Sequence, residues 1–357
     1  MDKIILKFLK KLEKNGYSAF IVGGYVRDKL LGKESYDIDI CTNALPKDVI
    51  KIFNLDKSTK EEYGRVNVKT KKYNIDITTF RSESNYKNHS PKSVNYVKDL
   101  KTDLKRRDFT INGLVMNSNE EIIDYYNGIN DLEKKQVKCI GSTKIRLNED
   151  PLRMLRAIRF SIIYDFYIDD EIIKFILNNK NLIEGISFFR KKEELDKILS
   201  CNNKIEGLKL IKKLNLCSIL GLEYDNIIYC KDILGMYAQI KFSDKYQITK
   251  NEKEIIDNVR NILRIGKINN NTLYDYGLYI NSIAGEILGV DLIKLNHMYK
   301  NLPIKSRKDI KITLESIVKL NNNCYNGINE IYRDLERNIL SGSLKNKNKD
   351  IVRFIRK

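Results

Sequence analysis

Gly23-Gly24-Tyr25-Val26-Arg27-Asp28 is followed, thirteen residues after Gly24, by Asp37-Ile38-Asp39-Ile40. Side chains alternate along a strand, so Asp37 and Asp39 are expected on one face while the isoleucines point into a core. Carboxylates this close repel each other unless a divalent cation lies between them, and Mg²⁺ prefers such oxygen ligands, completed by phosphate and water. The glycine pair lets backbone N–H groups approach a phosphate. These features indicate metal-dependent nucleotidyl transfer; the alternative is a loop aspartate and a helix-capping aspartate beside an ordinary glycine turn.

The charge balance of the chain is strongly basic. Among 357 residues, 65 lysines and arginines outweigh 47 acidic residues, which leaves a formal net charge of +18. Such an excess favours a polyanionic partner, with RNA or DNA as the leading candidate, although a basic protein without such a partner would share this composition. The length indicates two to four compact units.

Cysteine and histidine usage argues against a zinc site. The six cysteines are scattered, no Cys-x-x-Cys pair occurs, and His89 and His297 are far apart in the chain. This pattern is typical of reduced thiols in a cytosolic protein. No apolar run approaches the roughly 20 residues that a membrane helix needs. We therefore expect a cytoplasmic protein with no membrane partner.

An α+β region is expected to precede a helical remainder. Helices and strands alternate up to about residue 140, whereas from Asp150 onward apolar residues recur at helical spacing. The end of the chain, from Ser341, carries six basic residues and one acidic residue, and is either a solvated terminus or a polyanion contact. The elements predicted for the first region are helices over 2–15, 26–31 and 46–53 and strands over 19–22, 36–40, 64–69 and 74–80.

A third carboxylate is expected beside the two aspartates of the 36–40 strand. Asp76 lies between Ile75 and Ile77 with the same alternation, and a neighbouring strand would bring it close. Three carboxylates could hold two metal ions, one lowering the pKa of an attacking hydroxyl and one steadying a leaving pyrophosphate. No histidine is placed to act as a general base, which favours a metal-activated nucleophile. Ordinary strand-edge polarity is the alternative for Asp76.

Two later motifs carry polar residues suited to a nucleotide. In Arg106-Arg107-Asp108-Phe109-Thr110-Ile111-Asn112-Gly113-Leu114, guanidinium forks suit triphosphate oxygens, whereas Asp and Asn suit ribose hydroxyls; a charged helix start is the alternative. In the run Glu149-Asp150-Pro151-Leu152-Arg153-Met154-Leu155-Arg156, the polar residues are expected on the arc opposite the apolar ones. Asp150 and Arg153, at i and i+3, could present an acceptor and a donor fork to a base edge. Asp150 is equally suited to capping the helix, and both roles stay open.

In this order, Gly-Gly-x-Val-Arg-Asp, Asp-x-Asp, Arg-Arg-Asp-Phe-Thr-Ile-Asn-Gly and Glu-Asp-x-x-Arg resemble the motifs of the class II tRNA nucleotidyltransferase and bacterial poly(A) polymerase family. Asp124-Tyr125-Tyr126-Asn127-Gly128 with Asp131-Leu132 resembles the family's hinge-like motif. The resemblance covers residues 20–200. It implies an α+β nucleotidyltransferase head followed by an all-α neck, body and tail, with the divisions 1–140, 141–200, 201–300 and 301–357, the basic tail contacting tRNA.

The resemblance also implies roles for individual residues. In the family, the residues matching Asp37 and Asp39 hold Mg²⁺, and the residue matching Asp108 reads the ribose. Those matching Asp150 and Arg153 form a protein template for CTP and ATP. The nucleotide-binding residues implied in this chain are Gly23, Gly24, Arg27, Asp28, Arg107, Asp108, Asn112, Glu149, Asp150, Arg153 and Arg156.

Three features refine this comparison. The later family motif usually reads Glu-Arg followed by paired glutamates, whereas this chain has Phe189 before Arg190. The segment from Phe80 to Val97 resembles the loop that A-adding members need and is full length, which argues against addition of C alone, although its middle, Tyr86–Pro91, departs from the usual acidic and arginine residues. No His-Asp dipeptide occurs, so no phosphodiesterase activity is expected.

The function expected is template-independent addition of CCA to tRNA 3′ ends from CTP and ATP, with release of pyrophosphate. Catalysis is expected from Asp37, Asp39 and Asp76 with Mg²⁺ as the cofactor. The nearest alternative is a poly(A) polymerase or an A-adding enzyme of the same family. An alternative of another class is a non-catalytic RNA-binding protein on a degenerate scaffold, against which the intact carboxylates argue.

Overall fold

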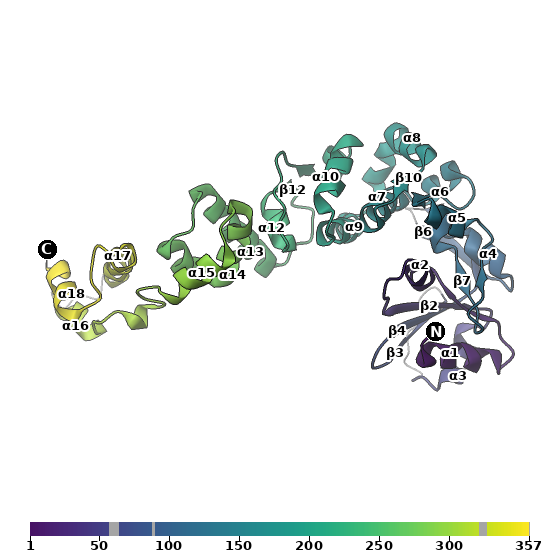
Figure 1. The fold of residues 1–357 in the computed structure, drawn as a ribbon, viewed down its shortest axis with the longest axis horizontal. Helices are drawn as coiled ribbons and strands as arrows, with labels where there is room; N and C mark the ends of the chain where they lie inside the picture. Colours follow the sequence, from purple (N-terminus) through teal and green to yellow (C-terminus); the bar gives the residue numbers. More distant parts are fainter. Residues whose placement is uncertain (57–63, 88–89, 321–326, 357) are drawn as a thin grey trace. The chain divides into compact units, whose positions relative to one another are not determined.

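The computed structural model describes residues 1–56, 64–87, 90–320 and 327–356, and the chain forms two compact units, Met1–Gly221 and Leu222–Lys357 (Figure 1). Asn88 and His89, in the middle of the predicted loop, and Cys324 lie outside the described residues. The first unit contains the predicted head and neck and the first helices of the predicted body.

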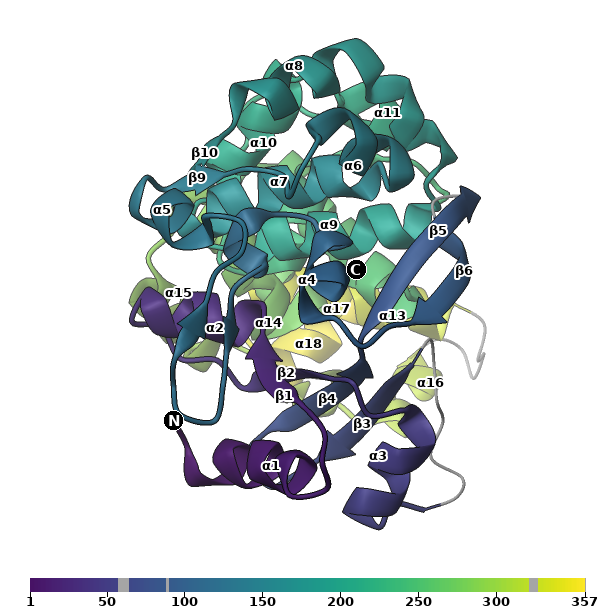
Figure 2. The ribbon, with the colours of Figure 1, turned by 90° about the vertical axis from the view of Figure 1, so that its right-hand side faces the viewer.

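A mixed sheet organises the first unit. Its strands run in the order β3–β4–β2–β1–β7–β8, in which β2 and β4 are parallel and the other neighbours antiparallel. A separate hairpin of β5 and β6 stands beside the sheet (Figure 2). The bounds are β1 (Ala19–Val22), β2 (Asp37–Thr42), β3 (Arg65–Lys69), β4 (Asn74–Thr79), β5 (Arg81–Lys87), β6 (Ser90–Tyr96), β7 (Val115–Met116) and β8 (Ile122–Ile123).

The register separates an apolar row from a polar row on the two faces of the sheet. Ile21, Ile40 and Ile77 are neighbours across β1, β2 and β4, and all three are fully buried. One position away, on the opposite face, Asp39 is the partner of Asp76. The isoleucines of β2 are buried and its two aspartates are exposed, which confirms the predicted alternation.

Helices α1 (Lys3–Glu13) and α3 (Pro46–Phe53) pack against the sheet and against each other. The apolar face of α1 is buried, and Phe8 stacks on Phe53 of α3 with 4.8 Å between ring centroids. Asp2 caps α1 by accepting from the Ile4 N–H, and Pro46 begins α3, where its missing N–H costs nothing. Helix α2 (Gly24–Leu30) follows β1 directly and contacts both β1 and β2.

The rest of the first unit is mainly helical, and α7 packs against α9 and α10. Its elements are α4 (Leu100–Lys105), η1 (Thr110–Asn112), α5 (Gly128–Glu133), β9 (Gln136–Val137), α6 (Thr143–Glu149), α7 (Leu152–Tyr164), β10 (Tyr167–Ile168), α8 (Asp170–Asn179), η2 (Lys180–Gly185), α9 (Phe188–Ser200), α10 (Lys204–Lys213) and α11 (Cys217–Leu220).

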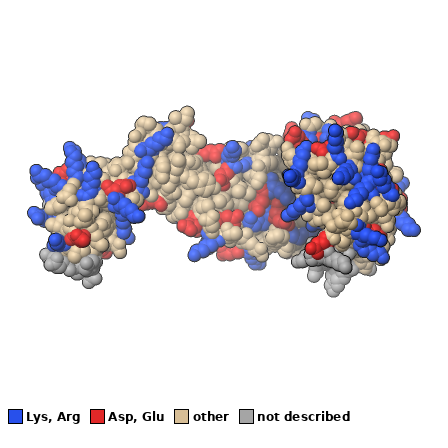
Figure 3. All heavy atoms as spheres, turned by 90° about the horizontal axis from the view of Figure 1, so that it is seen from below, with Lys and Arg blue, Asp and Glu red and all other residues tan. Residues whose placement is uncertain are grey.

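The second unit is helical around its own core. Buried residues from α14 to α18, such as Leu273, Leu295, Ile317 and Leu335, pack together there. Figure 3 shows many Lys and Arg side chains over its C-terminal part. Nowhere in the described ranges does a helix combine the length and apolar content needed to span a membrane. The elements are β11 (Leu222–Glu223), α12 (Ile233–Ala238), β12 (Lys241–Phe242), α13 (Lys250–Ile265), α14 (Asn270–Leu288), α15 (Leu292–Lys300), η3 (Arg307–Asp309), α16 (Leu314–Leu320), α17 (Ile328–Ser341) and α18 (Asn348–Ile355).

The elements predicted for the first region are present, with ends that differ by no more than two residues. The α+β head and helical remainder are therefore confirmed. Two local features differ from expectation. The segment predicted only as a loop forms the β5–β6 hairpin, and a further helix, α6, ends just before Asp150, which is in extended conformation ahead of α7.

Candidate active site

Three aspartates lie together on the exposed face of the sheet. Asp37 and Asp39 come from β2, and Asp76 of β4 is the register partner of Asp39. Asp76 accepts hydrogen bonds from Asn67 Nδ2 at 2.7 Å and from Arg65 Nη1 at 3.3 Å. The third carboxylate thus lies beside the pair, on the neighbouring strand where it was predicted.

The electrostatics around Asp39 suit a bound cation. Although Asp39 is exposed to solvent, the surrounding protein partly desolvates its carboxyl and raises its pKa; the Arg107 guanidinium opposes this shift, and the Asp76 and Asp37 carboxylates reinforce it. Within the described part of the chain, no three His, Cys, Asp or Glu side chains are arranged to hold a metal ion. The protein ligands would therefore be the two β2 aspartates, with the remaining positions filled by substrate phosphate and water, as Mg²⁺ tolerates. The residues fit an ion shared between protein and substrate.

The backbone turns sharply at the glycine pair between β1 and α2. Gly23 has a φ of +74° and donates its N–H to the Leu114 carbonyl at 3.1 Å. A β-carbon at this position would lie 3.5 Å from Arg107 Nη1 and 3.8 Å from Asp39 Oδ2. Glycine therefore meets the backbone requirement and leaves the approach to Asp39 open. Because the Gly23 N–H is used within the fold, an incoming phosphate would meet the first turn of α2.

Arg27 of α2 is buried and ties the sheet region to α7. Its guanidinium donates to Asp28 Oδ1, with Nε at 3.0 Å, and to Asn112 and the Tyr164 hydroxyl. The Tyr164 hydroxyl donates to the same Asp28 oxygen at 2.8 Å. Burial raises the pKa of Tyr164 to about 12, so the hydroxyl stays protonated. Arg27 and Asp28, predicted from one motif, and Asn112, predicted from another, are thus brought into one hydrogen-bonded group.

A single aromatic ring supports three arginines in this region. The Phe160 ring centroid lies 5.2 Å from the guanidinium carbon of Arg27, 5.5 Å from that of Arg156 and 4.3 Å from that of Arg159. Because the faces of an aromatic ring attract cations, Phe160 offsets part of the repulsion among these guanidinium groups. It also contacts Phe109 edge to face at 5.7 Å.

Asp108 is buried and accepts several hydrogen bonds. It accepts from the Phe109 N–H at 2.8 Å, from Asn112 Nδ2 at 3.0 Å and from Arg156 Nε at 2.7 Å. Burial alone would raise its pKa, but Arg156, Asn112 and Arg153 outweigh that effect and hold the pKa of Asp108 well below its ordinary value. Arg156, predicted as a nucleotide-binding residue, is therefore the counter-ion of Asp108.

Asp150 and Arg153 are close to the cleft but are both engaged within the protein. Asp150 accepts from the Leu152 N–H at 3.2 Å and so caps the start of α7. It also forms an ion pair with Arg190 Nη2 at 3.0 Å. Arg153, expected on the polar arc of the helix, is buried, and its side chain donates to the carbonyls of Arg146 at 2.9 Å and Arg106 at 2.8 Å.

A second ionic network joins the base of the hairpin to α4. Arg81 Nη2 lies 2.6 Å from Glu83, and Arg106 contacts both Glu83 at 3.3 Å and Asp103 at 2.9 Å. Arg107 lies 3.6 Å from the other oxygen of Asp103, which is completely buried. This network fixes Arg106 and Arg107 at the edge of the carboxylate row.

These groups surround one cleft of about 630 Å³. The predicted residues Asp28, Asp37, Asp76 and Glu149 lie behind or beside its lining. Several lining residues were missed from the sequence. Arg159, which continues the three-residue spacing of Arg153 and Arg156, and Arg190, which belongs to the later family motif, had a detectable signal, whereas Lys197 had none. The lining comprises Gly23, Gly24, Arg27, Asp39, Arg81, Glu83, Arg106, Arg107, Asp108, Asn112, Asp150, Leu152, Arg153, Arg156, Arg159, Phe160, Arg190 and Lys197.

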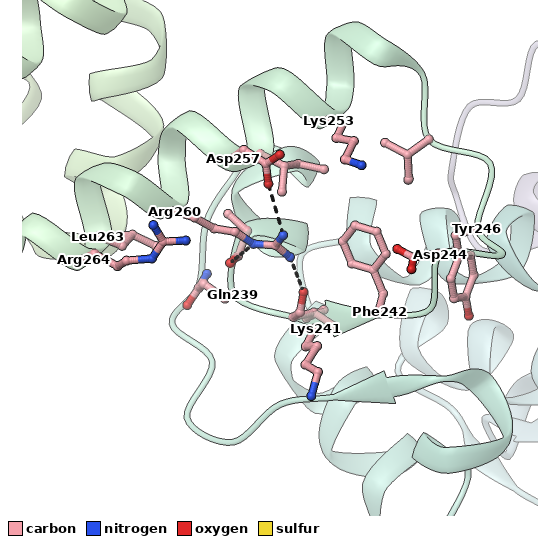
Figure 4. A pocket seen from close by; sticks show the side chains of 14 residues that line it. Gln239, Lys241, Phe242, Asp244, Tyr246, Lys253, Asp257, Arg260, Leu263 and Arg264 are labelled. Atoms are coloured by element: carbon pink, nitrogen blue, oxygen red, sulfur yellow. Dashed lines mark hydrogen bonds and ion pairs between the residues drawn. The ribbon is translucent and has the colours of Figure 1, made fainter.

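The second unit contains a larger cavity, of about 800 Å³, between β12 and α13 (Figure 4). Arg260 projects into it, but its guanidinium donates to the carbonyls of Ala238, Tyr237 and Ile240 and pairs with Asp257. The guanidinium of Arg260 is therefore already hydrogen-bonded within the protein, and it also lies over the Phe242 ring. The lining has no carboxylate pair on a strand and no glycine turn, so we assign the chemistry to the smaller cleft of the first unit.

The chain is similar to known proteins over most of its length. Residues 19–138 match the family described as the poly A polymerase head domain, and residues 165–227 match the family described as a probable RNA and SrmB-binding site of polymerase A. The CCA-adding enzyme of Ligilactobacillus salivarius (strain UCC118) is 32% identical, over 99% of this chain and 96% of the relative. That of Lactococcus lactis subsp. lactis (strain IL1403) is 34% identical, over 88% and 81%.

Solved structures share the fold over nearly the whole chain. The Bacillus stearothermophilus CCA-adding enzyme in complex with CTP superposes with a TM-score of 0.83 at 24% identity, over 99% of this chain and 97% of that one. The Thermotoga maritima CCA-adding enzyme complexed with tRNA-CCA superposes with a TM-score of 0.72 at 20% identity, over 99% and 95%.

Proposed function

Because this chain belongs to the CCA-adding enzyme family, we propose that it adds C, C and A to tRNA 3′ ends, using CTP and ATP and releasing pyrophosphate. The observation that carries the proposal is the convergence of Asp39, Arg27, Asp108 and Asp150 on one cleft, a set that a binding module would not need. Family members generally depend on a divalent metal, and we propose Mg²⁺ held by Asp37 and Asp39. We place the reaction in the cytoplasm, where immature tRNA is available.

We propose that different side chains bind different parts of the nucleotide during the transfer. Arg27 and Arg107 would hold the triphosphate, and Asp108 would accept from the ribose hydroxyls. The tRNA 3′-oxygen forms a bond to the α-phosphorus while the bond to the bridging oxygen breaks. Pyrophosphate leaves with that electron pair, and the hydroxyl proton passes to solvent. A bound divalent ion supplies charge that lowers the pKa of the attacking hydroxyl and stabilises the leaving group.

The test is nucleotide incorporation on three tRNA transcripts, ending at the discriminator base, at C and at CC. CTP and ATP are supplied separately and together with Mg²⁺. We expect each transcript to receive its missing residues and no more. Adenylation only of the CC-ending transcript would make the protein an A-adding enzyme, unlimited A tails would make it a poly(A) polymerase, and no addition would leave a non-catalytic RNA-binding protein.

Arg153→Ala is expected to reduce discrimination between CTP and ATP by at least about tenfold, because one charged donor fork is removed from the base-reading region. The KM for tRNA should change less than twofold. The measurement is kcat/KM for each nucleotide on transcripts ending at C and at CC.

Arg146→Ala is the matched control, since Arg146 shares the partner Glu149 with Arg153 but does not line the cleft. Both variants should show a similar fall in melting temperature. Unchanged nucleotide preference in Arg153→Ala would contradict the base-reading role.

Phe160→Leu is expected to raise the KM for CTP and for ATP alike, by about three- to tenfold, because three guanidinium groups lose the ring that holds them together. The CTP-to-ATP preference should not change. Phe166→Leu is the control, since Phe166 is also buried and its described ring contact is with Tyr164. Equal effects of the two substitutions would show that lost packing, rather than arginine placement, is responsible.

A further inference from the structure

A second cavity adjoins the carboxylate row on the side away from α7. Its volume is about 410 Å³. It shares Asp39, Arg81, Arg106 and Arg107 with the active-site cleft of the first unit, which is the larger of these two neighbouring cavities. Its own lining comes from the sheet: Val22, Ile40, Thr78 and Arg65. Two hollows therefore meet at Asp39.

The two hollows differ in the chemistry of their walls. The larger one has the glycine turn and the Asp108, Asp150 and Arg153 side chains that suit a nucleoside triphosphate. The smaller one has neither a glycine turn nor an acceptor–donor pair for a base edge among its lining residues, and its polar groups other than Asp39 are a threonine hydroxyl and four arginines. Such a wall suits the phosphodiester backbone of a nucleic acid.

Arg65 is the arginine of this cavity that can reach a ligand. The side chains of Arg81, Arg106 and Arg107 are between 15% and 17% exposed and are paired with Glu83 or Asp103. Arg65 is 52% exposed, far more than the other three, and contacts Asp76 at 3.3 Å. It lies opposite Thr78 in the β3–β4 pairing, at the end of β3 nearest the cavity.

We propose that this cavity receives the 3′ end of the acceptor RNA, with Arg65 binding the phosphate of its last internucleotide linkage. The inference rests on the proposed function, because nucleotidyl transfer requires two substrates to meet at one set of carboxylates. With the triphosphate in the larger cleft, an RNA strand in the smaller one places its terminal 3′-hydroxyl toward Asp39. The Arg65–Asp76 contact then links the phosphate-binding group to the carboxylate row.

The first test compares Arg65→Ala, Arg65→Lys and Lys69→Ala in the full-length protein, with a tRNA transcript ending in CC and with ATP. Lys69 lies four residues along β3, on the same face as Arg65, and outside the cavity lining. Arg65→Ala is expected to raise the KM for RNA about tenfold, with the KM for ATP unchanged within about twofold. Its RNA affinity should depend less steeply on salt, by about one unit of slope. Arg65→Lys should be intermediate and Lys69→Ala should match the wild type.

A role confined to orienting Asp76 would give a different result. Arg65→Ala would then lower kcat at saturating RNA and leave the KM for RNA and the salt slope unchanged, and that outcome would overturn the proposed RNA contact. Melting temperatures of the variants separate either effect from a loss of folding.

The second test neutralises the phosphate itself. A transcript with a methylphosphonate at its last internucleotide linkage should raise the KM for the wild type by the same factor as Arg65→Ala does on ordinary RNA. The two changes together should cost no more than either alone, because they remove the same contact. Independent, multiplying effects would show that Arg65 binds elsewhere. Wild-type protein that adds no nucleotide would overturn the proposed function and this inference together, whereas wild-type activity with an unaltered Arg65→Ala variant would overturn this inference alone.

Discussion

Asp39→Asn is expected to reduce nucleotide addition by more than about a thousandfold, because it removes a negative charge from the centre of the carboxylate row, where we propose that the metal ion binds. Binding of tRNA should persist, since phosphate contacts with lysine and arginine supply most of that affinity. The measurements are single-turnover incorporation with Mg²⁺ and CTP, and filter binding of the same transcript.

The control for this variant is Asp170→Asn. Asp170 is exposed in the first turn of α8, in the same unit and away from the cleft lining, so the substitution removes the same charge without touching the site. It should leave both incorporation and binding at wild-type levels. Turnover retained in Asp39→Asn would contradict the metal assignment, whereas loss of RNA binding along with activity would point to a disrupted sheet.

Asp108→Asn is expected to lower the free energy of unfolding by about 3 kcal/mol at neutral pH, because it leaves the Arg156 guanidinium beside a buried neutral group. The wild-type carboxylate accepts from Arg156 at 2.7 Å and is itself buried. The measurement is denaturant unfolding of the two proteins from pH 7 to pH 3.

The pH dependence of this difference has a definite sign. The pKa of Asp108 in the folded protein lies below its ordinary value of 3.8, so its stabilising contribution is complete above that value and is lost as the pH falls toward the folded-state pKa. The gap between wild type and Asp108→Asn should therefore narrow as the pH drops below about 4. A gap of constant size down to pH 3 would rule out the charge-based explanation.

Asp131→Asn provides the comparison. Asp131 is also buried, but the donor it accepts from is the neutral Thr110 hydroxyl, at 2.6 Å. Removing its charge leaves no cation without a partner, and the expected loss in the free energy of unfolding is about 1 kcal/mol. An equally large loss of unfolding free energy in both variants would indicate that substitution of any buried aspartate in this region destabilises the protein, whatever its partner.

Features governed by local spacing were predictable. The alternation in β2 followed from a two-residue period, and the register then confirmed that Asp76 lies beside Asp39. The β5–β6 hairpin was missed because its strands are polar on both faces near Arg81, so no apolar alternation distinguished them from a loop. Arg65 was missed for a related reason, since a single arginine at a strand end carries no periodic signal.

The chemistry of short motifs was enough to predict which side chains could serve phosphate, ribose, base and metal, because those residues are close in the chain and their spacing fixes their faces. Which of them pair in the folded protein depended on tertiary contacts. Arg190 reaches Asp150 across 40 positions and Arg156 reaches Asp108 across 48, and no local pattern encodes such partners. Burial of Arg153 also depended on tertiary contacts, because its side chain is held by the Arg106 carbonyl, 47 positions away in the chain.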